Sequence, residues 1–314
     1  VLAKEAGLEL GIKESIVVND RMETSVPDIY AAGDAVQVKH YVTGNDALIS
    51  LAGPANKQGR IIADNICGGD SRYLGSQGSS VIKVFDMTAA TTGINETNAK
   101  KSGLEVDTVI LSPMSHAGYY PGGKVMTMKV VFEKESYRLL GAQIIGYEGV
   151  DKRIDVLATA IHAGLNATQL KDLDLAYAPP YSSAKDPVNM AGFMIDNIAK
   201  GTLKQWHLED MDKISRDKSV VLLDVRTVGE FSRGHIDGFK NIPVDELRER
   251  ISEIEIGKPV YLICQSGLRS YIASRILEGN GYETYNFSGG FRFYDAVVND
   301  RALIERAYAC GMDY

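Results

Sequence analysis

The chain has 314 residues, of which 45% are hydrophobic and 24% charged, a composition typical of globular proteins. Its length exceeds the usual size of one hydrophobic core, so we expect two or three domains. The formal net charge of −7 argues against nucleic acid as a partner, because phosphate backbones are bound by clustered basic residues. We find no run of about 18 apolar residues and expect no membrane span. Three widely spaced cysteines favour the cytoplasm.

The N-terminal region has the pattern of an α/β domain that is entered partway through. The chain begins without methionine, and its first apolar strand is predicted at residues 16–18. A second apolar run, residues 29–32, predicts a buried strand that ends at Gly33 and Asp34. A glycine there lets the backbone approach a ligand closely, and the carboxylate accepts hydrogen bonds from sugar hydroxyls. We therefore expect residues 1–75 to be the C-terminal part of a larger domain.

Residues 47–65 predict a helix whose apolar positions fall on one face. Together with residues 24–35, this helix resembles the second flavin fingerprint of the flavoprotein disulfide reductases that contain two dinucleotide-binding domains. The resemblance implies FAD as the cofactor. The residues that it assigns to FAD are Gly33, Asp34, Ala52 and Ala55, and it places Asn56 near the substrate thiol. The alternative for each of them is a plain role in helix packing.

A Gly/Ser-rich stretch, residues 75–80, predicts a domain boundary. The sequence that follows it changes to alternating strand and helix patterns. The predicted elements are strands at residues 81–87, 126–132 and 139–146, and an amphipathic helix at residues 151–163. We therefore expect an α+β domain over residues 76–200.

This α+β module resembles the dimerisation domain of the same reductases. Its segments 118–122 and 177–187 resemble those of coenzyme A disulfide reductases and persulfide reductases. The resemblance implies a homodimer in which tyrosines of one subunit reach the active site of the other. It assigns catalytic roles to Tyr119 and Tyr177, and coenzyme A or substrate contacts to Tyr181 and Lys185. Packing in the interface is the alternative role of the tyrosines.

The same resemblance implies electron transfer from NADH or NADPH to small-molecule disulfides or persulfides. No Gly-x-Gly-x-x-Gly motif occurs in the chain, so the pyrophosphate loops for FAD and NAD(P)H are expected upstream. The redox-active cysteine of the flavin site is expected upstream as well, because neither Cys67 nor Cys310 has a matching context. No residues at metal-ligand spacing suggest a metal site.

The last third of the chain places Cys264 where an apolar strand runs into a loop that opens a helix. The backbone N–H groups of such a loop point inward, and the helix N-terminus adds partial positive charge. Arg269 adds a rigid fork of donors. This arrangement favours the thiolate of Cys264 and a catalytic role for both residues. The alternative is a small buried cysteine that only fills space.

Further motifs flank this loop: Leu-Leu-Asp-Val-Arg at residues 222–226, a motif from Glu230 and Phe231 to Gly-His-Ile-Asp-Gly at 234–238, Asn-Ile-Pro at 241–243, and Ser-Gly-Gly-Phe at 288–291. In this order they resemble the rhodanese family, and the resemblance predicts a rhodanese-like α/β domain over residues 208–314. In that family the loop cysteine carries sulfane sulfur as a persulfide. The residues expected to cradle this persulfide are Gln265, Ser266, Gly267, Leu268 and Ser270. Four residues separate Cys264 from Arg269, one fewer than a loop for phosphate or arsenate needs, which disfavours a phosphatase or an arsenate reductase. Asp224, Arg226 and His235 are expected to brace the loop.

The predicted fold class is α/β multidomain: the C-terminal end of a two-dinucleotide-binding-domain flavoprotein, an α+β dimerisation domain and a rhodanese-like α/β domain. The predicted function is FAD- and NAD(P)H-dependent reduction of coenzyme A disulfide, coenzyme A persulfide or polysulfide. In this hypothesis the rhodanese-like domain handles sulfane sulfur on Cys264. The alternative is a sulfur-carrier or sulfurtransferase module without net reductase activity.

Overall fold

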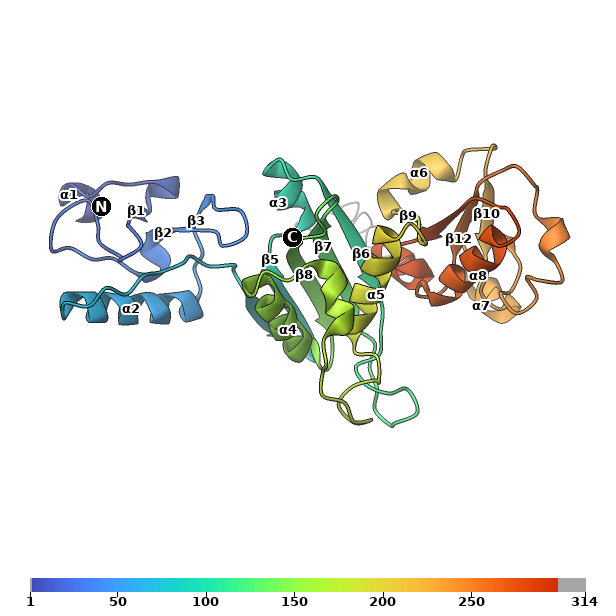
Figure 1. Cartoon of the computed structure of the whole chain (residues 1–314), viewed down its shortest axis with the longest axis horizontal. Coiled ribbons are helices and arrows are strands. Elements are labelled where there is room, and N and C mark those ends of the chain that lie inside the picture. Colours follow the sequence, from blue (N-terminus) through green and yellow to red (C-terminus); the bar gives the residue numbers. More distant parts are fainter. Residues whose placement is uncertain (1, 299–314) are drawn as a thin grey trace, which may run out of the picture.

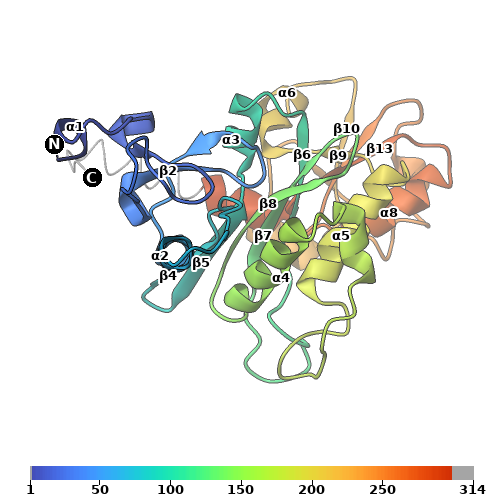
Figure 2. The ribbon, with the colours of Figure 1, turned by 60° about the vertical axis from the view of Figure 1, so that its left-hand side comes forward.

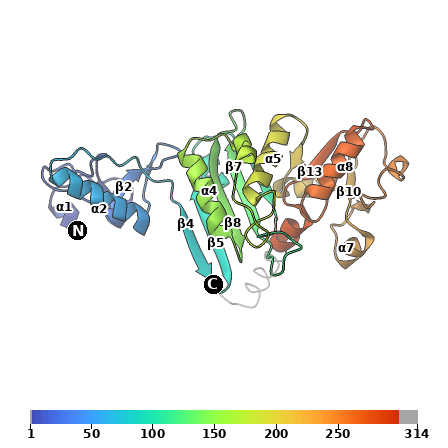
Figure 3. The ribbon, with the colours of Figure 1, turned by 60° about the horizontal axis from the view of Figure 1, so that its bottom comes forward.

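The structure is a computed structural model that describes residues 2–298. The chain forms three modules in a row, as Figure 1 shows: an N-terminal α/β module, a central module and a C-terminal module. The two rotated views in Figures 2 and 3 show the same order. Residues 299–314, the end of the predicted third domain, lie outside the described residues.

The N-terminal module contains a three-stranded sheet in the order β1-β2-β3. Its elements are α1 (Leu2–Glu5), η1 (Ile12–Glu14), β1 (Ile16–Val17), η2 (Gly33–Ala35), β2 (Val36–Lys39), β3 (Asp46–Ala47) and α2 (Ala52–Ile66). Strand β1 runs parallel to β2, and β3 runs antiparallel to β2. The buried side chains of Met22, Val36 and Val38 pack against Ile61 and Ile62 of α2, which explains the apolar face of that helix.

The predicted strand at residues 29–32 is wrong. Tyr30 makes only an isolated bridge to Glu23, and Ile29 is 37% exposed. No regular strand forms because the segment lies between two turns. Asp28, just before it, has a φ of 63°, in the left-handed region, and the 3-10 turn η2 begins directly after it at Gly33. The helix predicted at residues 47–65 starts later, at Ala52, because residue 47 still belongs to β3.

The central module is a five-stranded antiparallel sheet in the order β4-β5-β8-β7-β6, with α4 and α5 packed beside it (Figure 1). Its elements are β4 (Ser80–Val84), β5 (Met87–Gly93), α3 (Glu96–Lys101), β6 (Val106–Leu111), β7 (Thr127–Glu133), β8 (Leu139–Gly146), α4 (Val150–His162), η3 (Ala167–Asp172) and α5 (Pro187–Ala199). The core joins sheet and helices through fully buried apolar side chains, among them Val130, Ile144, Leu157 and Ile195. The hydrophobic effect of this burial holds the layers together.

Several elements of this module differ from the sequence prediction. The single strand predicted at residues 81–87 is a hairpin, because Phe85 has a φ of 51° and reverses the chain between β4 and β5. Strand β6 and helix α5 were not predicted. Helix α5 nevertheless has a clear start signal, since the Asp186 side chain accepts a hydrogen bond from the amide of Val188 and Pro187 occupies the first helical position.

The C-terminal module is a parallel five-stranded sheet in the order β11-β10-β12-β13-β9. Its elements are β9 (Gln205–Trp206), η4 (Leu208–Asp210), α6 (Met211–Ile214), β10 (Val221–Asp224), α7 (Val228–Arg233), β11 (Lys240–Asn241), η5 (Ile251–Glu253), β12 (Val260–Ile263), α8 (Leu268–Glu278) and β13 (Thr284–Phe287). Residues 290–298 are also helical. The sheet begins before the predicted start at residue 208, because Trp206 is buried against Phe287 and joins β9 to β13.

The edge strand β6 connects the central and C-terminal modules. The amide of Ile110 donates a hydrogen bond to Ser288 Oγ at 3.1 Å. The side-chain amide of Gln205 donates to the carbonyl of Thr108 at 3.2 Å. His207 Nε2 lies 3.1 Å from Asp107 Oδ1. The C-terminal module is therefore fixed to β6 at three positions of the strand, residues 107, 108 and 110.

Among residues 2–298 no helix combines the length and the apolar character that crossing a membrane requires. The same residues contain no group of three or more His, Cys, Asp and Glu side chains placed to hold a metal ion.

Candidate functional site

Cys264 lies at the start of the loop between β12 and α8. Its side chain is only 1% exposed, and its sulfur accepts two hydrogen bonds. The amide of Gly267 donates to Sγ at 3.1 Å, and the hydroxyl of Ser270 lies 3.2 Å from Sγ and 3.1 Å from the carbonyl of Gly267, so these two acceptors share its proton. Both donors belong to the beginning of α8, where Gly267 adopts a φ of 102° that favours glycine. Donors at a helix N-terminus can stabilise negative charge on the sulfur.

A second segment, residues 288–291, packs against the backbone of the Cys264 loop. The amide of Phe291 donates to the carbonyl of Cys264 at 2.8 Å. A Cβ atom on Gly290 would lie 2.6 Å from the amide nitrogen of Ser266, so only glycine fits at this approach. The Ser-Gly-Gly-Phe motif thus shapes the loop that holds the sulfur, a role that sequence alone did not assign to it.

Arg269 forms an ion pair with Glu230 of α7 instead of contacting the sulfur. Its two terminal nitrogens donate to the two carboxylate oxygens at 2.6 and 2.7 Å. The hydrogen bond from Arg269 lowers the pKa of Glu230 to about 2, and Glu230 raises the pKa of Arg269. Within residues 2–298 no hydrogen bond joins Arg269 to Cys264. Glu230 was missed as a functional residue, although it lies in the motif that precedes His235.

The predicted bracing residues have different surroundings. Asp224 and Arg226 form a buried ion pair with 2.7 Å between Oδ2 and Nη2. The guanidinium carbon of Arg226 lies 3.8 Å from the ring centroid of Phe291, so this pair supports the residue that binds the Cys264 carbonyl. His235 is exposed and stacks on Phe231, with 4.0 Å between the ring centroids.

The central module brings two of the predicted tyrosines together. The hydroxyl oxygens of Tyr119 and Tyr177 lie 2.9 Å apart, although the two residues come from separate loops. This hydrogen bond raises the pKa of Tyr177 above its ordinary value of 10.0. Tyr119 is 77% exposed and Tyr177 is 45% exposed, so the pair is accessible from solvent.

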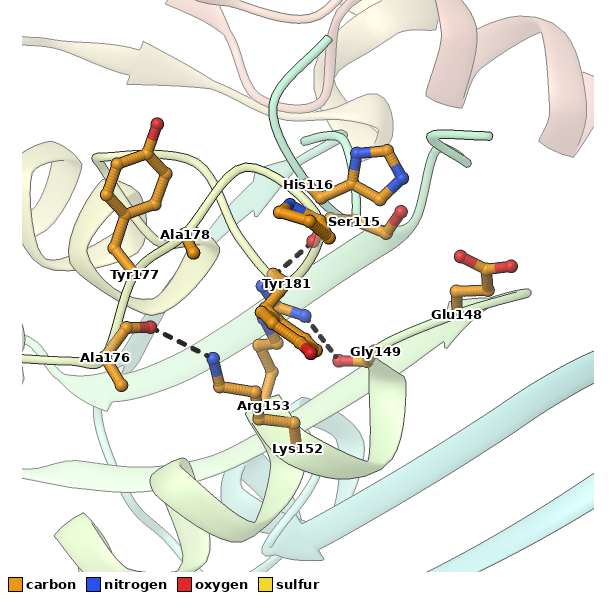
Figure 4. A pocket seen from close by; sticks show the side chains of 11 residues that line it. Ser115, His116, Glu148, Gly149, Lys152, Arg153, Ala176, Tyr177, Ala178 and Tyr181 are labelled. Atoms are coloured by element: carbon orange, nitrogen blue, oxygen red, sulfur yellow. Dashed lines mark hydrogen bonds between the residues drawn. The ribbon is translucent and has the colours of Figure 1, made fainter. Parts of the chain in front are cut away.

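Tyr177 and Tyr181 line a cavity of about 440 Å³, together with His116, Glu148 and Lys152 (Figure 4). This volume lies in the range of small-molecule sites. Lys152 Nζ lies 3.5 Å from the carbonyl of Ala176 at one side of the cavity.

A buried ion pair, in which Arg153 lines the cavity, supports the wall of this cavity. Arg153 of α4 and Asp186 at the start of α5 are 1% and 3% exposed, and Nη2 lies 3.0 Å from Oδ2. The same nitrogen donates to the carbonyls of Ser115 and Tyr181 at 3.0 and 3.3 Å. One guanidinium therefore joins the two loops that carry the tyrosines. Sequence reasoning missed this pair; the Asp-Pro dipeptide at the start of α5 was the available signal.

Lys185 does not line the tyrosine cavity. Its Nζ lies 5.6 Å from the ring centroid of Phe193, and it lines a different cavity of about 380 Å³ between α5 and the loop after Cys264. The structure therefore separates Lys185 from Tyr177 and Tyr181, which the sequence placed in one substrate-binding segment.

The predicted cofactor residues meet at the N-terminal end of α2. Gly33 has a φ of 76°, and its amide donates to the Gln58 side chain at 2.7 Å, which holds the η2 turn against this helix. The residues Asp34, Ala52 and Asn56 are exposed on this side. Ala55 was predicted to bind FAD. Its amide already donates to the carbonyl of Leu51 within the helix, so this amide cannot face a ligand.

The chain matches known families over three segments. Residues 79–187 match the pyridine nucleotide-disulphide oxidoreductase dimerisation domain, and residues 207–296 match the rhodanese-like domain. Residues 1–59 match the pyridine nucleotide-disulphide oxidoreductase family. These matches follow the order of the three modules in the structure.

Solved structures and curated proteins agree with these matches. The chain is 48% identical to the reduced CoADR-RHD of Bacillus anthracis, with a TM-score of 0.92 over 96% of this chain and 54% of that one. It is 42% identical to the NAD-dependent persulfide reductase of A. fulgidus, with a TM-score of 0.85 over 93% and 54%. It is 38% identical to the CoA-dependent NAD(P)H sulfur oxidoreductase of Pyrococcus abyssi, over 60% of this chain and 42% of that protein.

The chain thus spans about half the length of the proteins that it matches. The resemblance to coenzyme A disulfide reductases and persulfide reductases with a rhodanese domain is confirmed, and so is the predicted fold class.

Proposed function

We propose that this chain, as part of a pyridine nucleotide-disulfide oxidoreductase joined to a rhodanese-like domain, handles sulfane sulfur on Cys264. The reaction that it serves is the NAD(P)H-dependent reduction of coenzyme A disulfides or persulfides, or of polysulfide. The observation that carries the proposal is the pair of hydrogen bonds to Cys264 Sγ, from the Gly267 amide and the Ser270 hydroxyl.

The sulfur step is a thiol–persulfide exchange. The Cys264 thiolate attacks the outer sulfur of a persulfide R–S–SH, a bond forms between the two sulfurs, and the original sulfur–sulfur bond breaks. The products are a Cys264 persulfide and the thiolate R–S⁻, so no oxidant or reductant is consumed. The donors at the start of α8 point at Sγ and are placed to hydrogen-bond the sulfur before and after the exchange. Arg269 stays with Glu230 in this scheme and keeps the first turn of α8 in place.

The N-terminal module fits FAD at the exposed end of α2. No side chain caps this helix, so the amides of Ala52 and Gly53 can face an acceptor of the cofactor. The exposed carboxylate of Asp34 accepts hydrogen bonds from sugar hydroxyls, and the tight turn at Gly33 keeps it beside α2. When bound, FAD supplies electron transfer between the nicotinamide and the disulfide.

The assignment of coenzyme A and NAD(P)H is supported by the names of the similar proteins. The relative from Staphylococcus aureus, 36% identical over 60% of this chain, is a coenzyme A disulfide reductase. The match to a dimerisation domain supports a homodimer. In that dimer the exposed hydroxyls of Tyr119 and Tyr177 hydrogen-bond a thiolate or persulfide in the site of the second subunit.

The sulfur step is tested with Cys264→Ser and a matched control, Cys67→Ser, which changes an exposed cysteine at the end of α2. Each protein is incubated with coenzyme A persulfide, and intact mass spectrometry measures sulfur addition. We expect the wild type and the control to gain a sulfur atom that thiol treatment removes, and Cys264→Ser to gain none. Sulfur addition to Cys264→Ser at the wild-type level would contradict the proposal.

The reductase step is tested by the absorbance of the full-length protein under anaerobic conditions. We expect a flavin spectrum that NADH or NADPH bleaches and that coenzyme A persulfide restores. A protein that binds no flavin but still loads Cys264 would instead be a sulfur carrier. The observation that favours this second candidate is that both donors to Cys264 Sγ, the Gly267 amide and the Ser270 hydroxyl, belong to the C-terminal module itself.

A further inference from the structure

Asn286 is a polar residue in the interior of the C-terminal sheet. It belongs to β13, is 3% exposed, and pairs with Leu262 of β12, which is fully buried. Its side-chain nitrogen donates a hydrogen bond to the carbonyl of Gly267 at 3.2 Å. Its Oδ1 is buried and has no hydrogen-bond partner within residues 2–298. Such an amide stabilises a sheet poorly, because its unpaired oxygen loses hydration and gains no hydrogen bond in return.

The one hydrogen bond of the Asn286 side chain reaches a carbonyl beside the sulfur. Gly267 donates its amide to Cys264 Sγ at 3.1 Å. The carbonyl of the same residue lies within hydrogen-bond distance of three donors: the amide of Tyr271 at 3.1 Å, the side-chain nitrogen of Asn286 at 3.2 Å and the hydroxyl of Ser270 at 3.1 Å. A carbonyl oxygen has two lone pairs, so two of these donors are enough to occupy it.

The hydroxyl of Ser270 is the donor that has a second acceptor. Ser270 is fully buried, and its Oγ lies 3.2 Å from Cys264 Sγ and 3.1 Å from the carbonyl of Gly267. The single hydroxyl proton rotates about the Cβ–Oγ bond and points best at one acceptor at a time. The amide of Tyr271 is fixed by the first turn of α8 and always uses one lone pair of the carbonyl. When Asn286 uses the other, the hydroxyl proton has its better acceptor in the sulfur.

We propose that Asn286 is a positioning residue for Cys264, which acts by turning the Ser270 hydroxyl from the Gly267 carbonyl to the sulfur. This inference rests on the proposed function of Cys264 and adds to it the side chain that keeps the second donor on Sγ. A hydroxyl proton that points at an anionic sulfur stabilises it, whereas a hydroxyl that donates elsewhere turns its lone pairs toward the sulfur. The exchange itself is unchanged, with one sulfur–sulfur bond formed and one broken.

This role differs from a purely structural one in its effect on stability. Asn286→Leu removes the hydrogen bond to Gly267 together with the buried, unpaired Oδ1, and these two changes have opposite effects on the fold. We therefore expect its unfolding midpoint in urea to stay near that of the wild type. Asn286→Val is the second variant, because a β-branched residue suits a strand and also lacks a donor.

The test is the pH profile of sulfur loading on Cys264, with thiosulfate as donor and intact mass spectrometry as the readout. The Cys264 thiolate takes the outer sulfur of thiosulfate and sulfite leaves, while Cys264→Ser gives the background from other cysteines. In both Asn286 variants, loading near neutral pH should slow about tenfold and the midpoint of the profile should rise by about one pH unit. The rates should converge at high pH, where the thiolate forms without help.

The matched control is Asn280→Leu. It removes a side-chain donor to the carbonyl of Ile276, near the opposite end of α8, and should leave the profile unchanged. The charged side chains near the loop are paired with each other, Arg269 with Glu230 and Arg226 with Asp224, and none of these substitutions alters them. A shifted midpoint in the Asn286 variants alone therefore reports the lost hydrogen bond.

A double-mutant cycle tests the route through Ser270. Ser270→Ala alone should slow loading near neutral pH about tenfold, and the addition of Asn286→Leu should slow it no further, because no hydroxyl is left to turn. Additive effects of the two substitutions, or a wild-type profile in Asn286→Leu, would overturn the proposal. Failure of both Asn286 variants to fold would show a structural residue and would overturn it as well.

Alkylation of Cys264 by iodoacetamide, which needs the thiolate but no sulfur exchange, is followed over the same pH range. A wild type that is alkylated but not loaded with sulfur refutes the proposed function alone, and the Asn286 variants are then compared by alkylation. A wild type that is loaded, with alkylation and loading profiles that Asn286→Leu does not shift, refutes the positioning role alone.

Discussion

The ion pair between Glu230 and Arg269 gives a sharp test of how the Cys264 loop is held. The substitution Glu230→Gln keeps the size of the side chain and removes its charge. An amide offers one acceptor oxygen where the carboxylate offers two, so one of the hydrogen bonds of 2.6 and 2.7 Å is lost and the other loses the negative charge of its acceptor. The first turn of α8 thereby loses most of its anchor on α7. We therefore expect a loss of stability near neutral pH.

The magnitude follows from the pKa of Glu230. Lowering a carboxyl pKa from 4.5 to about 2 corresponds to at most roughly 3 kcal/mol of stability. The side chains of Arg269 and Glu230 are 29% and 23% exposed, so solvent screens part of this interaction, and we expect a loss of about 1–2 kcal/mol. Because the folded-state pKa is depressed, the stabilisation is complete above the unfolded-state pKa and is lost as pH falls toward about 2.

The assay is urea unfolding of the wild type, Glu230→Gln and a control, Glu249→Gln, which changes an exposed glutamate of the same module. Glu230→Gln should be less stable than both near neutral pH, and its deficit should shrink below pH about 4.5, the ordinary pKa of the group. A deficit that persists unchanged into acid would refute the electrostatic reasoning. Equal stability of the two variants near neutral pH would refute the anchoring role.

Three further changes test other parts of the molecule. Gly290→Ala should abolish sulfur loading of Cys264, because the new Cβ would lie 2.6 Å from the backbone of the Cys264 loop. The control is Gly281→Ala, at a position with a φ of 84° and open space. It should lower the free energy of unfolding by only about 1 kcal/mol and keep sulfur loading in the same mass assay. Asp186→Asn should lower the free energy of unfolding in urea by about 3–5 kcal/mol, since it leaves a buried guanidinium without its charged partner; a loss below 1 kcal/mol would contradict this role. Tyr119→Phe should return the pKa of Tyr177 toward 10.0, measured by ultraviolet titration against Tyr181→Phe as control, and an unchanged pKa would contradict the hydrogen bond.

Features that depend on neighbouring residues were predictable from the sequence. The apolar run that forms β12, the loop at Cys264 and the helix α8 follow one another directly, so local pattern alone predicted that Cys264 lies in a loop between a strand and a helix. The strand β8, Leu139–Gly146, also has the predicted bounds, because both of its ends are marked by a change in hydrophobic pattern. Here short-range signals and tertiary packing favour the same structure.

Features that depend on distant residues were not predictable. Arg269 was expected at the anion, but both of its terminal nitrogens donate to Glu230, 39 positions away. The buried Arg153 pairs with Asp186, 33 positions later, and the sequence around neither residue indicates this pairing. The cavity beside Lys185 requires α5 and the Cys264 loop to meet, which is a property of the packed modules. Charge pairing between elements is set by the fold and carries no periodic signal.

The strand β6 relates the two candidate sites to each other. The amide of Ile110 binds Ser288, at the beginning of the segment that braces the Cys264 loop. A few residues later the same chain segment contributes Ser112 to the cavity beside Lys185 and then enters the loop that carries Tyr119. Because β6 forms hydrogen bonds with the C-terminal module and leads directly into the loop that carries Tyr119, this strand links the position of the Cys264 loop to that of the tyrosine loop within the chain.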